Sequence, residues 1–156
     1  MKDTGTANAG VPADQIAEET ATTAPISLDS FLNLPDVKDL TEEIKLQRLG
    51  ALTISAMTST QHKDYQKACT RTFVKGAKKG TVDFDMGKFE LMIASNHIIS
   101  PDFSNANFLS KVGFTDAADF IKRKFKPGEI QDIYKAVSEL SGFDADIDED
   151  VETAKN

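Results

Sequence analysis

The 156-residue sequence has no tryptophan, only one cysteine and no long apolar run. A lone cysteine excludes an internal disulfide and is usual in proteins of reducing compartments. No stretch approaches the ~20 apolar residues that a membrane-spanning helix needs, and the N-terminal region lacks the apolar core of a secretion signal. We therefore expect a soluble protein of the cytoplasm that makes no contact with membranes.

Charge is distributed unevenly along the chain. Residues 1–43 carry a net charge of −7 and residues 141–156 a net charge of −5, whereas residues 44–88 carry +6. The overall charge of −7 disfavours nucleic acid as a partner. The basic middle of the chain can still attract an acidic partner or one of the chain's own acidic ends.

Hydrophobic periodicity predicts a mainly α protein of the α+β class, a small helical bundle with a short N-terminal β-hairpin. Ile44 and Leu46, then Leu52 and Ile54, alternate with polar residues on either side of Gly50, which indicates two strands. Apolar residues at three- and four-residue spacing, bounded by capping residues and by glycine or proline, predict five helices. The hairpin is predicted at 43–57 and the helices at 58–74, 85–98, 104–112, 115–125 and 128–141.

The two ends of the chain are poor in large apolar residues, so we predict disordered acidic segments at 1–26 and 144–156. The length suits one domain between them, at 27–143. A short helix at 27–34 is predicted to open this domain, because Ser27 can cap it and Pro35 ends it.

One acidic pattern invites comparison with a calcium loop. Asp144, Asp146 and Asp148 match its positions 1, 3 and 5. That loop also needs glycine at position 6 and glutamate at position 12, where this chain has Glu149 and Lys155. The pattern therefore indicates a solvated acidic segment, and no metal is expected.

A basic region follows the first long predicted helix. Lys75–Thr81 contains two glycines, but only three residues separate them, so the phosphate-loop spacing is absent and a flexible basic loop is predicted. No aromatic residues are interleaved here as a platform for stacking bases. Binding of nucleic acid or of a regulatory partner stays open for the basic side chains Lys63, Lys67, Arg71, Lys75, Lys78 and Lys79.

No set of residues indicates catalysis or a cofactor. His62 and His97 lack a second ligand at the spacing of zinc sites. Cys69, His62 and Asp64 could be combined as a nucleophile set, but about two helical turns separate Cys69 from His62. We expect Cys69 to be a small buried residue and the protein not to be an enzyme.

An ordered set of motifs in the second half carries a family resemblance. A Pro-Gly-Glu-hydrophobic step at Lys126–Ile130 precedes a predicted helix that ends in the Gly-Phe-Asp of Ser141–Asp144. Upstream motifs in the matching order are Ile99–Phe103, Asp85–Phe89 and Lys67–Arg71. In this arrangement the chain resembles the tail assembly chaperones that long-tailed phages and prophages of Gram-positive bacteria encode.

The resemblance implies a non-enzymatic role. Such chaperones bind the long, helical and aggregation-prone tape measure protein before the tail tube polymerises around it. It follows that the tape measure protein is the expected partner, with the tail tube protein and a second copy of this chain left open. The resemblance also implies action in the host cell cytoplasm and absence from the mature virion.

Phe120, Phe125 and Tyr134 are candidate partner-binding residues, because they could line a groove between helices that accepts an amphipathic helix. Their helical spacing favours a place in the core over such a groove. Two other functions stay open. One is a structural tail-completion or head–tail joining protein of a phage, and the other is the basic-patch binder described above.

Overall fold

The computed structural model describes residues 26–143, and the chain divides into two compact units between Leu34 and Pro35. The first unit contains the short helix α2 (Leu28–Phe31), in the range where a helix was predicted. Ser27 precedes it but makes no capping hydrogen bond to the backbone. The predicted acidic segment at 144–156 lies outside the described residues, as does the leader before Ile26.

A three-stranded sheet opens the second unit, after the short 3-10 helix η1 (Val37–Asp39). Strands β1 (Thr41–Leu46) and β2 (Gly50–Ser55) pair antiparallel. Gly50 begins β2 with a φ of +87°, a left-handed conformation that glycine adopts without steric cost. Strand β5 (Ile98–Ser100) pairs antiparallel with the other edge of β2, so the order is β1–β2–β5.

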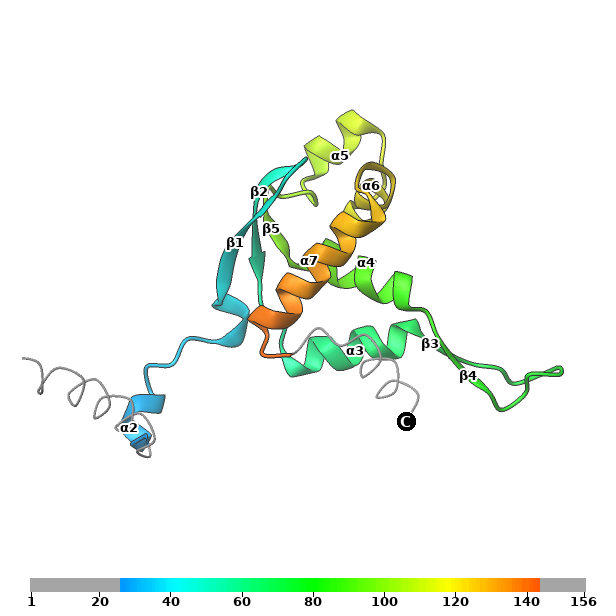
Figure 1. The fold of residues 1–156 in the computed structure, drawn as a ribbon, viewed down its shortest axis with the longest axis horizontal. Coiled ribbons are helices and arrows are strands. Elements are labelled where there is room, and N and C mark those ends of the chain that lie inside the picture. Colours follow the sequence, from blue (N-terminus) through cyan, green and yellow to red (C-terminus); the bar gives the residue numbers. More distant parts are fainter. Residues whose placement is uncertain (1–25, 144–156) are drawn as a thin grey trace, which may run out of the picture. The chain divides into compact units, whose positions relative to one another are not determined.

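The longest helices pack together beside this sheet (Figure 1). Helix α7 lies against α4 and against strands β1 and β2, while α4 also contacts α3 and α6. The helices of the second unit are α3 (Ser59–Cys69), α4 (Met86–His97), α5 (Ala106–Val112), α6 (Ala117–Lys124) and α7 (Pro127–Leu140). The combination of helix and strand predicted from the sequence is confirmed.

The core lies where α4, α6 and α7 meet the sheet. Its side chains come from apolar stripes that the sequence displays at helical spacing, together with the inward face of β2. The apolar residues with no exposed surface are Ile54, Phe89, Ile93, Ala94, Ile121, Ile133, Tyr134 and Val137.

Local capping explains why several helices begin where they do. Thr58 Oγ1 accepts from the Gln61 N–H and Gln61 Oε1 accepts from the Thr58 N–H, the capping box that their spacing predicts. Asp85 caps α4 by accepting from the Lys88 N–H at 3.0 Å. Asp116 caps α6 by accepting from the Asp119 N–H at 2.8 Å, so this helix begins at Ala117, two residues after the predicted start at 115.

The helix predicted at 58–74 is too long. Helix α3 ends at Cys69, and the chain becomes extended at Thr70 to form β3 (Thr70–Thr72). This strand pairs antiparallel with β4 (Val82–Phe84), which the sequence did not predict. Two β-branched threonines favour the extended chain, and pairing with β4 supplies the backbone hydrogen bonds that a longer helix would have made. The predicted flexible loop is therefore the turn of a second hairpin.

Candidate functional site

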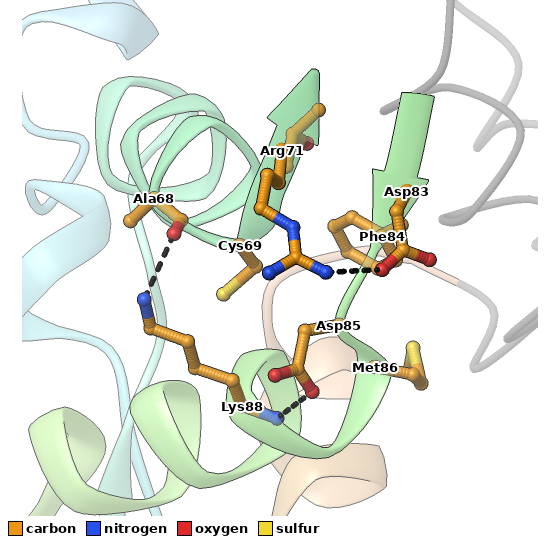
Figure 2. A pocket seen from close by; sticks show the side chains of 9 residues that line it. Ala68, Cys69, Arg71, Asp83, Phe84, Asp85, Met86 and Lys88 are labelled. Carbon is orange, nitrogen blue, oxygen red and sulfur yellow. Dashed lines mark hydrogen bonds and ion pairs between the residues drawn. The ribbon is translucent and has the colours of Figure 1, made fainter. Parts of the chain in front are cut away.

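An open pocket of about 420 Å³ lies where α3 runs into β3 and β4 runs into α4. Figure 2 shows Lys88 on one side of it and Arg71 with Asp83 on the other. The lining residues are Ala68, Cys69, Thr70, Arg71, Asp83, Phe84, Asp85, Met86 and Lys88. This corner brings together residues from α3, β3, β4 and α4, in the basic part of the chain.

The polar groups of the pocket mainly hold backbone in place. Lys88 Nζ donates to the carbonyl oxygen of Ala68 at 3.0 Å, which ties α4 to the last turn of α3. Arg71 Nη2 reaches Asp83 Oδ2 at 3.5 Å across the β3–β4 pair. These contacts position the hairpin and do not assemble an acid, a base and a nucleophile around a substrate.

Cys69 is buried against this pocket, in agreement with the sequence prediction. Burial raises the pKa of the Cys69 thiol, so the reactive thiolate is disfavoured. His62 lies against other partners, with its ring stacked on Phe143 at 4.5 Å and edge-to-face with Phe89 at 5.9 Å. Asp64 is exposed on α3. His62 and Cys69 are thus placed in the packing and Asp64 on the surface, so the three residues considered as a nucleophile set do not share one environment.

His97 is buried at the junction of α3, α4 and the sheet. Its Nδ1 lies 3.2 Å from Ser55 Oγ on β2, and its Nε2 lies 2.9 Å from the Tyr65 hydroxyl on α3. Burial lowers the pKa of His97 to about 4, so the ring is neutral near neutral pH. A neutral imidazole that bonds two hydroxyl groups joins these elements as a structural link.

Arg48 links the turn between β1 and β2 to the beginning of α7. Its Nε donates to the carboxylate of Glu129 at 3.1 Å, and its Nη2 donates to the carbonyl oxygen of Lys124 at 2.9 Å. The hydrogen bond from Arg48 lowers the pKa of Glu129, which also accepts from the Lys126 N–H. Arg48 and Glu129 lie 81 positions apart in the chain, and no sequence pattern predicted their contact.

The predicted partner-binding residues occupy different environments. Tyr134 is fully buried, and its ring meets Phe89 at 5.9 Å. Phe125 is buried as well, whereas Phe120 is half-buried and stacks on Phe103 at 5.4 Å. The structure therefore places Phe125 and Tyr134 in the core and Phe120 in an aromatic cluster with Phe103, Phe108 and Phe114. A contact of any of them with a partner stays a prediction.

The basic region contains an aromatic residue that the sequence reasoning missed. Phe73 follows β3, and Arg71 lies over its ring at 4.6 Å, with Lys78 Nζ at 5.5 Å. Phe73 falls within the helix predicted at 58–74, and a helix there does not indicate this arrangement. On α3, Lys63 and Lys67 are exposed one turn apart. Lys63 and Lys67 form a cationic face on the exposed side of α3, and Arg71 follows the helix on strand β3.

The first unit exposes large apolar side chains. Leu28 is 85% exposed, Phe31 52% and Leu32 81%, and the spacing of i, i+3 and i+4 places them on one side of the short helix α2. Ile26 and Leu34 are exposed as well. A contiguous apolar group of this kind is typical of a surface that binds a partner.

The described residues 26–143 contain neither a candidate metal site nor a candidate membrane-spanning helix. Within that part of the chain, no three residues of the types His, Cys, Asp and Glu lie together as a group that could hold a metal ion. Over the same residues, no helix combines the length and the apolar character needed to cross a bilayer. The acidic triplet compared above with a calcium loop lies outside the described residues.

Comparison with known proteins gives a family and a similar fold. The crystal structure of the protein yqbn has a TM-score of 0.55 to this chain at 17% identity and covers 78% of this chain and 100% of its own. At this identity the similarity shows the fold alone. No curated protein matches the chain. A family model described as Phage XkdN-like tail assembly chaperone protein, TAC, matches residues 28–155. Since that match extends over most of the sequence, the chain belongs to the XkdN-like family of phage tail assembly chaperones.

Proposed function

We propose that the chain binds the tape measure protein of its phage and keeps it soluble until the tail tube polymerises. Family membership supports a non-enzymatic role in tail assembly, with phage tail proteins as partners in general. The observation that carries the finer proposal is the exposed apolar row of Leu28, Phe31 and Leu32. These residues lie in the part of the chain that the family model matches.

The physical basis of the proposed contact is the docking of apolar anchors against a helical client. Side chains at i, i+3 and i+4 of α2 face one way and fit the apolar stripe of an amphipathic helix. Helix α2 has only four residues, so each contact is small and reversible. A long client offers many such stripes, and several copies of the chain can bind along it.

The charge of the chain suits such a coat. Residues 1–43 carry −7 and residues 141–156 carry −5, so a client covered with copies of this protein acquires a large negative charge. Like charges on separate complexes repel each other and keep them dispersed. The same complex would present the client to tail tube subunits, which are proposed as further partners, as is a second copy of this chain.

The proposed place of action is the cytoplasm of a Gram-positive host cell. A chaperone that leaves when the tube forms should be missing from purified particles, whereas a tail-completion or head–tail joining protein should be retained. Mass spectrometry of purified particles separates the two functions. Peptides of this chain at a stoichiometry similar to that of known tail components would favour the structural alternative.

Co-expression of the full chain with the tape measure protein of the same phage should bring most of the client into the soluble fraction and co-purify it. Replacing Leu28, Phe31 and Leu32 together by serine should lower the soluble client by at least about tenfold, since losing three apolar anchors costs more than the ~1.4 kcal/mol of binding free energy that equals a factor of ten. The amounts are read by quantitative gel analysis of the soluble fraction and of the pull-down.

A matched control removes exposed apolar side chains elsewhere. Val74 is 71% and Ile99 46% exposed, so Val74→Ser with Ile99→Ser makes a comparable change outside α2 and should leave the client soluble. All variants should keep the wild-type free energy of unfolding within about 0.5 kcal/mol, because the residues are exposed. A client that stays insoluble with the wild-type chain contradicts the proposed function. Full solubility with the triple variant contradicts only the assignment to α2.

A further inference from the structure

The cationic face on the outer side of α3 has no acidic partner of equal charge among the described residues. Lys63 and Lys67 are exposed, and neither forms an ion pair within residues 26–143. Arg71 contacts Asp83 at 3.5 Å, but both side chains are more than half exposed. Asp64 is the other carboxylate on this helix surface. The face therefore keeps a net positive charge.

The described part of the chain ends at Phe143, which contacts the first turn of α3, and the acidic segment follows it in the sequence. Helix α7 ends at Leu140, and Gly142 then adopts a φ of +89°, which turns the chain back. Ser141 Oγ accepts from the Met57 N–H at 2.9 Å, which fixes this end of α7 near the start of α3. The ring of Phe143 stacks on the ring of His62, with 4.5 Å between the ring centroids, and His62 directly precedes Lys63 in α3. The segment that follows Phe143 thus starts at the first turn of α3.

The length and charge of the segment match the face. Its acidic residues are Asp144, Asp146, Asp148, Glu149, Asp150 and Glu152. An extended chain advances about 3.3 Å per residue, so residues 144–152 reach about 30 Å. Lys63 and Lys67 are about 6 Å apart along the helix axis. The segment is therefore long enough to follow the whole cationic face with several carboxylates.

We propose that residues 144–152 bind the cationic face of α3 in the same chain and shield it from other polyanions. The bond is electrostatic, since exposed lysines and carboxylates attract each other without a fixed geometry. Closeness in the chain raises the effective concentration of the segment at the face far above that of an external acidic partner. The proposal is independent of client binding and can be tested on the purified protein alone.

A second cationic group provides an internal comparison. Lys122 and Lys124 are exposed on α6, next to the beginning of α7. Helix α7 has 14 residues, so its two ends lie about 20 Å apart. The acidic segment leaves from the far end, which gives it better access to Lys63 and Lys67 than to the lysines of α6.

Zero-length cross-linking with a carbodiimide tests the contact on the full chain, because it joins lysines to carboxylates that touch. Mass spectrometry should find Lys63 and Lys67 joined to carboxylates of 144–152, at least about fivefold above links from Lys122 or Lys124. The yield should fall several-fold between about 20 mM and about 500 mM salt, as the Debye length shrinks to a few ångströms. In a mixture of isotopically heavy and light protein, each cross-link should join two heavy peptides or two light peptides, because both ends come from the same chain. Mixed pairs would overturn binding within one chain, and equal links to the α6 lysines would overturn the choice of face.

Binding of a labelled poly-glutamate peptide tests the shielding. Replacing the six acidic residues of 144–152 by their amides should tighten this binding by about tenfold at low salt, since the face becomes free. Adding Lys63→Gln and Lys67→Gln should abolish the gain, whereas Lys122→Gln with Lys124→Gln should preserve most of it. An amide variant that binds the peptide as weakly as the wild-type chain would overturn the proposal. The core residues are untouched, so all variants should unfold at the wild-type denaturant midpoint.

Discussion

Replacing Phe89 by alanine is expected to lower the free energy of unfolding by about 3–5 kcal/mol. Phe89 has no exposed surface, and its ring meets the rings of Phe84 at 5.1 Å and of His62 and Tyr134 at 5.9 Å. Alanine would leave a cavity between α4, β4, α3 and α7. These elements cannot move together to close it, because each of the surrounding rings is held by its own helix or strand. Domains of this size have about 5–15 kcal/mol of stability, so a large share would be lost.

Chemical denaturation followed by far-ultraviolet circular dichroism measures this loss. Phe31 provides the matched control, since the same substitution there removes a ring that is 52% exposed. Phe31→Ala should change the free energy of unfolding by no more than about 0.5 kcal/mol. Similar losses at Phe31 and Phe89 would show that the core is not centred on the contact of α4 with α7.

Acidification is expected to destabilise the protein through His97. The pKa of this residue is lowered from 6.5 to about 4 in the folded state, mainly by burial. Because the unfolded chain takes up the proton more readily, the contribution of His97 to stability is fully present above pH 6.5. It is lost progressively as the pH falls toward 4. The shift corresponds to about 3 kcal/mol when the titration is complete.

Carboxylates titrate in the same range, so the effect of His97 is read as a difference between two proteins. His97→Gln keeps a side chain able to hydrogen-bond Ser55 or Tyr65 but removes the titrating ring. Free energies of unfolding measured at several pH values should fall more steeply for the wild-type chain than for this variant between about pH 6.5 and pH 4. Parallel curves would show that His97 is not held neutral by burial.

Much of the helical part of the fold could be predicted because its signals are local. The Thr58 capping box and the Asp85 cap act within one helical turn, so sequence spacing was enough to place both helix starts. Strands β3, β4 and β5 have three residues each, which is too short for a periodic pattern. Their partners decide their conformation, and pairing such as Ile54 with Ile98 brings together residues far apart in the chain.

The candidate sites were harder to predict than the fold. An apolar stripe such as that of α7 favours a core but does not exclude a groove, and the structure places Tyr134 and Phe125 inside. The spacing of Leu28, Phe31 and Leu32 indicated an apolar face of a helix but could not show whether anything covers it. The proposed contact of the acidic segment with the cationic face depends on where Phe143 lies, and its stacking on His62 is a long-range contact that the sequence did not indicate.

The order of the sheet has a consequence for how copies of this protein behave when crowded. Strand β1 is an outer strand, and Glu42, Glu43 and Lys45 are exposed along it. Strand β5 is the other outer strand, but it is short and Pro101 follows it without an N–H to donate. The charged side chains of edge strand β1 and the short length of edge strand β5 both oppose edge-to-edge pairing with another sheet. The three-stranded sheet is therefore expected to resist pairing with the same sheet of another copy when copies lie close together.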